Sequence, residues 1–308
     1  MTNGYLSLRA KRSNRKVLRL LRFARNDKYL TGHNIMANYL KISDYPLHLR
    51  LGIFLISLLS IWLPLAAPIY LLVKDSNLAT ILTMGLLFGE FMLLVQWWGK
   101  KVYRRPHLLK SYGLVRTREN ALDLLGGFGI GALLTFSLFG FEGLLGWLTW
   151  EESERGIKLI LEGLATGLGV GFAEELVFRG WLLDELQRDY SLKVSLWVNA
   201  LVFGLSHFLK PLSEMLRTWP QFPGLLLLGL ILVWAKRSHQ NRLGLPMGFH
   251  AGLIWSYYII NVGQLVRYSG SVPDWITGVD RNPLAGLMGL LFLGAIAFWM
   301  WKLSRSAS

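Results

Sequence analysis

The sequence predicts an all-α fold, a polytopic transmembrane helix bundle of about eight helices. Of the 308 residues, 53% are hydrophobic and only 17% are charged, which is too little charge for the polar surface of a soluble domain of this length. The charged residues gather between long apolar runs, as expected for membrane helices. Lysine and arginine are also distributed unequally between alternate connections, which is typical of a multi-pass membrane protein.

The chain begins with a polar, basic tail, for which we expect the boundaries 1–48. This tail has no signal-peptide pattern, because its basic region is long and no compact apolar core follows it directly. The leucine spacing in KVLRLLRFAR is typical of a basic amphipathic helix lying on the membrane, and a disordered tail is the alternative. We expect residues 49–308 to form the transmembrane domain.

Eight apolar segments follow the tail. Most of them reach the length of about 20 residues that a helix needs to cross about 30 Å of hydrocarbon. The fifth and sixth have about 14 residues each, so we expect them to be short tilted spans or a re-entrant hairpin buried among the other helices. The segments are 51–73, 78–98, 122–150, 157–178, 195–208, 222–235, 245–262 and 284–301.

The connections between these segments predict the orientation. If the tail lies inside, the inner connections hold most of the lysines and arginines, including Lys100, Lys101, Arg188, Lys236 and Arg237. An excess of these residues in short loops marks the cytoplasmic side, so both termini are predicted to be cytoplasmic. We therefore attribute the net charge of +14 to orientation and to anionic lipid, and we expect no nucleic-acid partner.

The fourth segment, GLATGLGVGFAEELVFRGWLLDEL, combines small residues with adjacent carboxylates. Three glycines spaced four apart form one face that permits close helix packing: Gly163, Gly167 and Gly171. A carboxylate inside an apolar helix is unfavourable by about 2.5 kcal/mol or more, so the presence of Glu174 and Glu175 in this segment indicates a functional or structural role. Arg179 is four residues after Glu175 and can pair with it, whereas Glu174 lies about 100° around the helix. We expect Glu174 to face a polar cavity as a general base, and an ion pair at the head-group level is the alternative.

Two histidines lie within apolar segments. His207 comes one turn after Phe203 in the fifth segment, and His250 lies in the first turns of the seventh. With Glu174, these side chains could hold a divalent metal such as zinc, or they could activate water without a metal, and the residues do not decide between the two. The chain has no HExxH pair and no cysteine, which excludes the helical zincin arrangement, thiolate ligands and disulfides.

The ordered motifs EExxxR, FxxxH and a later helical histidine resemble those of the CAAX protease and bacteriocin-processing family of intramembrane endopeptidases, which includes the type II CAAX prenyl endopeptidases. The resemblance implies an enzyme of the bilayer that hydrolyses a peptide bond of a membrane-anchored or lipidated substrate. It implies that Glu174 activates water and that Glu175 and Arg179 organise the site. His207 and His250 would orient the water or stabilise the oxyanion.

This likeness covers roughly residues 120–262 and has one departure. Characterised prenyl proteases of the family typically show HxxxN in the last motif, whereas Ile254 stands four residues after His250 here. An expected oxyanion donor is therefore missing. Three nearby residues could replace it without occupying the matching position: Ser206, Ser256 and Asn261.

The missing donor motivates a second hypothesis, a non-proteolytic membrane scaffold or anchor protein on the protease fold. A transporter is a third, because intramembrane carboxylates also mark proton pathways, although the sequence lacks repeated halves. Three other polar residues of the apolar segments are weaker candidates that could line the same cavity or simply lie near its ends: Glu90, Gln96 and Glu142.

Overall fold

The structure is a computed structural model that describes residues 41–152 and 156–306. The chain divides into two units, Met1–Tyr45 and Pro46–Ser308. In the first unit the described residues contain one 3-10 turn, η1 (Ile42–Asp44), and the predicted amphipathic or disordered tail lies otherwise outside the described residues. The second unit contains all the elements that follow.

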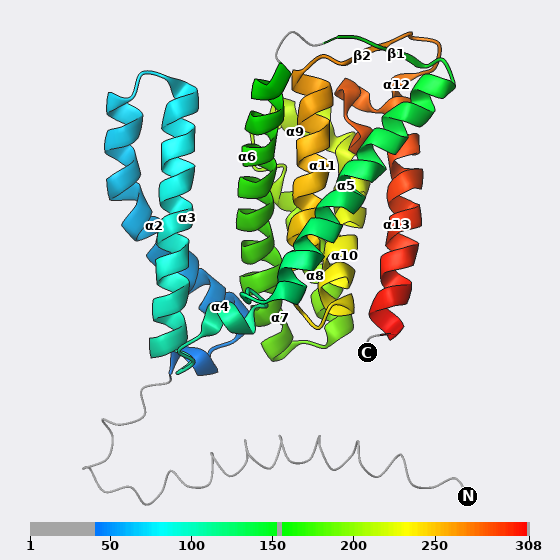
Figure 1. The fold of residues 1–308 in the computed structure, drawn as a ribbon. Helices are drawn as coiled ribbons and strands as arrows, with labels where there is room; N and C mark the ends of the chain where they lie inside the picture. The colour runs from blue at the N-terminus through cyan, green and yellow to red at the C-terminus, as the bar shows by residue number, and fades with distance from the viewer. Residues whose placement is uncertain (1–40, 153–155, 307–308) are drawn as a thin grey trace, which may run out of the picture. The chain divides into compact units, whose positions relative to one another are not determined.

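Each of the eight apolar segments forms a helix (Figure 1). Within the described residues, six runs are long and apolar enough to cross a membrane. The predicted all-α, polytopic bundle is therefore confirmed. The eight helices are α2 (Leu47–Leu72), α3 (Ser76–Lys101), α5 (Arg118–Leu144), α6 (Gly156–Glu175), α8 (Leu192–Ser206), α10 (Phe222–Ser238), α11 (Gly244–Val262) and α13 (Leu287–Ser306).

Two segments are longer than their apolar cores. α6 continues through a π-helical turn, η2 (Leu176–Leu182), into α7 (Leu183–Asp189), which makes one run of 34 residues. The sixth segment follows α9 (Leu212–Thr218) and η3 (Trp219–Gln221) directly, so that α10 ends a run of 27 residues. The fifth segment is short, as predicted, because α8 has 15 residues.

The third segment was expected to stay helical up to Trp150, but α5 ends at Leu144. Gly146 adopts a positive φ of 74°, a left-handed conformation that glycine takes without steric strain and that commonly ends a helix. The chain then forms a short strand, β1 (Leu148–Trp150), which pairs antiparallel with β2 (Val266–Tyr268). The remaining short elements are α4 (Leu108–Ser111), α12 (Asp274–Thr277), η4 (Val279–Arg281) and η5 (Pro283–Ala285).

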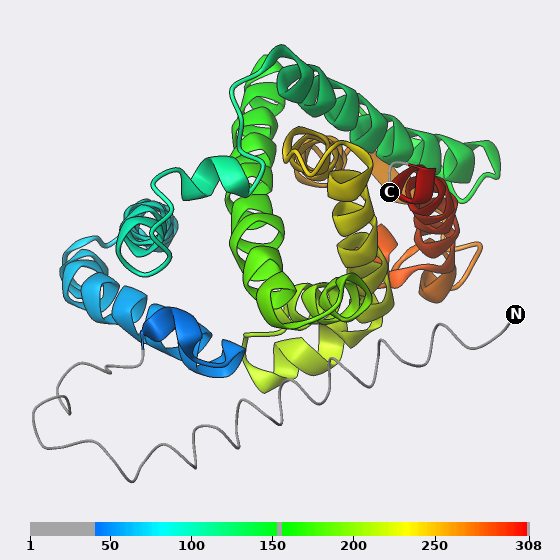
Figure 2. The same ribbon diagram turned by 90° about the horizontal axis from the view of Figure 1, so that it is seen from below.

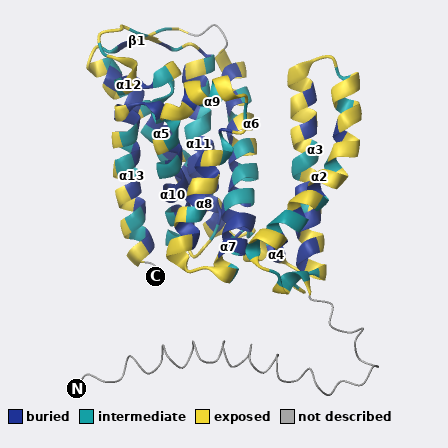
Figure 3. Ribbon diagram, turned by 180° about the vertical axis from the view of Figure 1, so that it is seen from behind, coloured by how far each residue is buried: buried dark blue, intermediate teal, exposed yellow. Residues whose placement is uncertain are grey.

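The core lies around α10 and α11. Figure 3 shows that buried residues concentrate on these two helices, and Figure 2 shows α11 between α5, α6 and α10. Glycine makes the contact between α5 and α11 close. A Cβ atom at Gly248 would lie 1.9 Å from the carbonyl oxygen of Leu124, a distance that forces the two helices apart. The α5–α11 spacing is therefore set by backbone atoms.

The hairpin of α2 and α3 exposes most of its apolar surface (Figure 3). Ile56 and Leu71, for example, are 67% and 84% exposed, as suits side chains that face lipid. A smaller buried face contacts the helices of the bundle: the rings of Phe54 and Trp181 are 4.6 Å apart, and those of Phe88 and Phe172 are 5.5 Å apart.

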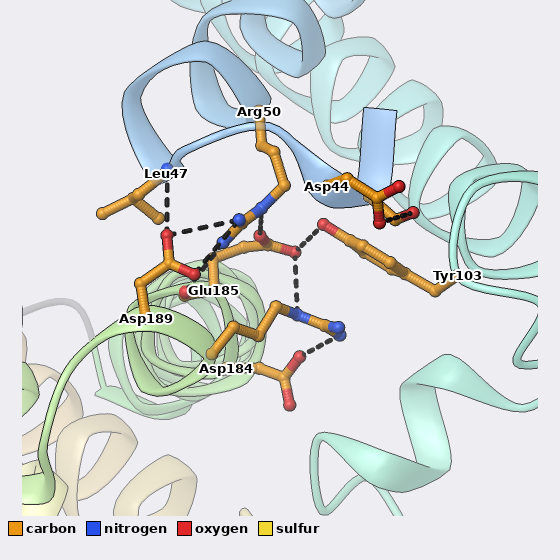
Figure 4. A network of polar contacts seen from close by, with 9 residues as sticks. Asp44, Leu47, Arg50, Tyr103, Asp184, Glu185 and Asp189 are labelled. Atoms are coloured by element: carbon orange, nitrogen blue, oxygen red, sulfur yellow. Dashed lines mark hydrogen bonds and ion pairs between the residues drawn. The ribbon is translucent and has the colours of Figure 1, made fainter. Parts of the chain in front are cut away.

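A polar network joins the first turn of α2 to α7 (Figure 4). The Nε atom of Arg50 donates to the carboxylate of Glu185 at 3.0 Å, and its guanidinium also bonds to Asp189. The hydroxyl of Tyr103 donates to the other oxygen of Glu185 at 2.6 Å. Burial and this bond to Glu185 raise the pKa of Tyr103 to about 12. The network therefore ties the hairpin to the helix that continues α6.

Candidate functional site

The predicted glycine face of α6 packs against α11. A Cβ atom at Gly167 would lie 2.6 Å from the carbonyl oxygen of Ala251, and one at Gly171 would lie 2.9 Å from that of Met247. Both distances are shorter than real Cβ contacts, so a larger residue would separate the helices. This close approach lies one turn from Glu175 on α6 and beside His250 on α11.

Glu175, Arg179 and His250 form a buried hydrogen-bonded group. Oε1 of Glu175 accepts from Nη1 of Arg179 at 2.9 Å, as the spacing predicted, and from Nδ1 of His250 at 2.9 Å. The side chains of Glu175 and Arg179 are fully buried. Because a carboxylate can only accept, Nδ1 of His250 carries the proton of this bond. The bond thereby fixes the orientation of the ring and leaves Nε2 available.

The guanidinium of Arg179 has further contacts that hold it. Nη2 donates to the carbonyl oxygen of Gly229 on α10 at 3.3 Å, and the guanidinium carbon lies 4.1 Å from the ring centre of Phe203 on α8. A planar guanidinium suits such combined bonding and stacking, which a lysine could not reproduce. Arg179 therefore connects α6 and η2 with both α8 and α10.

The backbone after Glu175 departs from α-helical geometry. The N–H of Leu183 reaches the carbonyl oxygens of Phe178 and Gly180, and the bond to Phe178 spans five residues, as in a π-helix. The side-chain amide of Asn199 on α8 also donates to the carbonyl oxygen of Phe178 at 2.7 Å. Such π-helical turns are rare and often lie at functional sites, and the hydrophobic pattern of the sequence gave no sign of this one.

Glu174 points away from the buried group toward His207, which caps the C-terminus of α8. Its Oε2 atom lies 3.9 Å from Nε2 of His207, too far for a direct hydrogen bond. Nδ1 of His207 bonds to the carbonyl oxygen of Phe203 at 2.8 Å, so Nδ1 carries a proton and Nε2 faces Glu174. Glu174 is 31% exposed, whereas its neighbour Glu175 is fully buried.

Glu174, His207 and His250 line one cavity of about 300 Å³. The short fifth helix, α8, ends directly before His207, which lines this cavity with the other two. Most of the wall is apolar and comes from α5, α10, α11 and α13, and Ile254 is part of it. Four other polar residues line the wall and were not predicted from the sequence, because the spacing of apolar segments does not show which side chains face a cavity. They are Thr135, Gln221, Tyr257 and Asn282.

The other candidates from the sequence lie elsewhere. Glu90, Gln96 and Glu142 are not among the residues that line this cavity, and Glu142 accepts a bond from Tyr268 at 3.2 Å instead. The possible replacements for the oxyanion donor do not line it either. The hydroxyls of Ser206 and Ser256 donate to carbonyl oxygens of their own helices at 2.8 and 2.7 Å.

In the described part of the chain, no group of three His, Cys, Asp or Glu side chains is placed so that it could hold a metal ion. Glu174, His207 and His250 share the cavity without forming such a group. As placed here, these three side chains do not make a fitting zinc site.

Residues 156–256 match the model of the family described as type II CAAX prenyl endopeptidase Rce1-like. A comparison with curated proteins found no match, and neither did one with solved structures. The matched segment begins with α6 and ends within α11, so it contains both glutamates, Arg179 and both histidines. It is narrower than the range 120–262 over which the motifs suggested a likeness. The match supports the relationship that the motifs indicated: residues 156–256 of this integral membrane protein are similar to the CAAX proteases, over the helices that hold the candidate site residues.

Proposed function

We propose that the protein is an intramembrane endopeptidase that hydrolyses a peptide bond of a membrane-anchored or lipidated substrate. One observation carries the proposal: Glu174, His207 and His250 line a single cavity among the helices. The family match supports a hydrolase of the CAAX-protease type at the level of the family. We further propose, from the lysines and arginines of the connections, that both termini lie on the cytoplasmic side.

In the proposed reaction, a water molecule lies between Glu174 and His207. The 3.9 Å between Oε2 of Glu174 and Nε2 of His207 is too long for a direct bond and suits two groups that share a water. His207 donates from Nδ1 to Phe203, so its Nε2 lone pair accepts one water proton and orients the water. Glu174 accepts the other proton as general base while the water oxygen attacks the substrate carbonyl carbon.

His250 is the proposed oxyanion donor. Nδ1 bonds to Glu175, and as an imidazolium the ring would donate from Nε2 to the oxyanion, with the Glu175 carboxylate balancing its charge. When the tetrahedral intermediate collapses, the carbon–nitrogen bond breaks and Glu174 passes its proton to the leaving amine nitrogen. The products are one peptide that ends in a carboxylate and one that begins with an amine.

The wall of the cavity fits a substrate that arrives from the bilayer. It is largely apolar, so it would bury the apolar side chains or anchor of such a substrate. The side chain of Glu174 is 31% exposed, whereas its Oε2 atom, which faces His207, is buried and has no hydrogen-bond partner among the described residues. A substrate held in the membrane would meet the site at a high effective concentration.

The test is cleavage of lipid-anchored peptides by the purified protein in liposomes, comparing wild type with Glu174→Gln. Loss of a general base lowers kcat by about 10²- to 10⁴-fold, which is the expected result. Glu162→Gln is the matched control, because Glu162 lies on the same helix, is 41% exposed and pairs with Lys158. Cleavage by the correctly folded Glu174→Gln protein at the wild-type rate would sink the proposal.

Ile254 favours a second candidate function, that of a scaffold or anchor without proteolysis. It places an aliphatic side chain in the cavity wall where characterised prenyl proteases carry an asparagine. If this candidate is correct, a Glu174→Gln protein will rescue the phenotype of a deletion strain, and no cleaved product will accumulate in the wild type. If the protease is correct, the same variant will fail to rescue.

A further inference from the structure

Lys236 is a buried lysine near the end of α10. The distribution of charges suggested that it belongs to an inner connection, but the structure places it inside the helix with only 6% of its surface exposed. Its Nζ atom donates to the carbonyl oxygen of Arg179 at 2.6 Å. A buried ammonium needs a partner of this kind, and the partner here is the backbone of a proposed site residue.

The carbonyl oxygen of Arg179 needs a donor because of the π-helical turn. In an α-helix it would accept from the N–H of Leu183, four residues later. In this structure that N–H reaches Phe178 and Gly180 instead. Buried backbone carbonyls are almost always paired, and Lys236 supplies the bond that the turn has removed.

A chain of contacts leads from Lys236 to the cavity. Lys236 holds the backbone of Arg179, Nη1 of Arg179 bonds to Glu175, and Glu175 holds the ring of His250. Each of these three bonds is 2.9 Å or shorter. Of the groups in this chain, His250 lines the cavity, whereas Lys236 does not.

α10 holds Arg179 at two points. The carbonyl oxygen of Gly229 accepts from the guanidinium, and seven residues later Lys236 donates to the carbonyl of the same arginine. Seven residues are about two helical turns, so both groups are on the same face of α10. One helix face therefore fixes both the main chain and the side chain of Arg179.

We propose that Lys236 is a positioning residue for the hydrolytic site. Its ammonium stabilises the π-helical turn, and the turn directs Arg179 onto Glu175 so that His250 is held with Nε2 toward the substrate. Its role in catalysis rests on the proposed function, whereas its effect on His250 does not. Lys236 acts through Arg179 and touches no reacting atom.

The experiment compares Lys236→Met, Lys236→Arg and wild type. Methionine keeps the length and loses the donor, and arginine restores a donor. Arg237→Met is the matched control, because Arg237 is the next residue and donates to Leu192 rather than to the turn. The first readout is the nitrogen-15 NMR signal of Nδ1 of His250, assigned by its loss in His250→Gln. The second is kcat and KM for cleavage in liposomes.

The expected result is a shifted His250 signal in Lys236→Met with the signal of His207 unchanged. We also expect kcat to fall about tenfold or more at unchanged KM, since small displacements of catalytic groups have effects of this size. Lys236→Arg is expected to recover both readouts, and Arg237→Met to match wild type. A His250 signal and kcat in Lys236→Met equal to those of wild type would overturn the proposal.

Two further outcomes still test whether Lys236 positions His250. If Lys236→Met does not fold, Lys236→Leu, which also lacks a donor, replaces it, and an unshifted His250 signal in that variant with normal kcat contradicts the proposal. If wild type cleaves no peptide, the proposed function fails, but the NMR signal still decides whether Lys236 positions His250. The two failures are therefore distinguishable.

Discussion

Replacing Arg179 by methionine would remove one member of an ion pair whose two side chains are fully buried. Glu175 would keep only the bond to His250, and the bond to Gly229 and the stacking on Phe203 would be lost as well. Breaking a buried pair by removing one partner lowers the free energy of unfolding by about 3–5 kcal/mol. For a domain of this size, about 2–4 °C per kcal/mol converts this into a fall in Tm of about 6–20 °C.

Thermal unfolding in detergent measures this loss. The double variant Glu175→Gln/Arg179→Met removes both charges, so it is expected to recover much of the stability lost in Arg179→Met. The recovered part measures the effect of leaving the Glu175 charge unpaired, and the part not recovered measures the loss of packing. Arg217→Met is the control for a charge change, because Arg217 is 51% exposed and exposed pairs contribute about 1 kcal/mol or less. The reasoning is refuted if Arg179→Met unfolds within about 1 kcal/mol of wild type, or if the double variant loses the sum of both single effects.

Three further predictions address packing, chemistry and pH. Gly248→Ala should lower Tm by several degrees, because its Cβ atom would overlap the backbone of α5. Gly126→Ala is the control, because its Cβ atom would meet nothing within 4 Å and Tm should not change. Equal Tm values for the two variants would contradict the packing of α5 on α11. Ile254→Asn should raise kcat about tenfold in liposomes by restoring an oxyanion donor, and an unchanged or lower rate would count against the proposed geometry. Tyr103 has a pKa of about 12 in the folded state, above its ordinary value of 10.0, so the folded state favours the neutral phenol. The neutral phenol therefore contributes to the free energy of unfolding below pH 10.0, and this contribution is lost as the pH rises from 10.0 to about 12. Tyr103→Phe removes the hydroxyl and its bond to Glu185, so the free energy of unfolding of this variant should fall less at alkaline pH than that of wild type. Unfolding at several pH values measures the difference.

The sequence predicted the helices well because their signal is local. A run of apolar side chains needs no knowledge of the rest of the chain, and the eight segments accordingly became helices. The pairing of Glu175 with Arg179 was also local, because the two residues are one turn apart. The end of α5 was missed because Leu148–Trp150 is as apolar as the helix before it, and its pairing with Val266–Tyr268 bridges more than 100 residues.

The contacts between distant residues were only partly predictable. The motif order suggested that Glu174, His207 and His250 meet, and the structure brings them to one cavity; their catalytic roles stay predictions. Lys236 was wrongly assigned to an inner connection, because a lysine at the end of an apolar run usually belongs to the loop that follows. In the structure it lies within α10 and donates to the backbone carbonyl of Arg179. The apolar run continues through the π-helical turn, so the hydrophobic pattern gave no sign of it.

The glycine face of α6 bears on how the protein responds to its bilayer. Because Gly167 and Gly171 let α6 and α11 touch through backbone atoms, the spacing of the two helices that carry Glu175 and His250 is set by the main chain. A thinner or thicker bilayer can change the tilt of α2 and α3, whose surfaces face mostly outward. Because α6 and α11 are in backbone contact, we expect the two helices that hold the buried group to keep their spacing when that tilt changes.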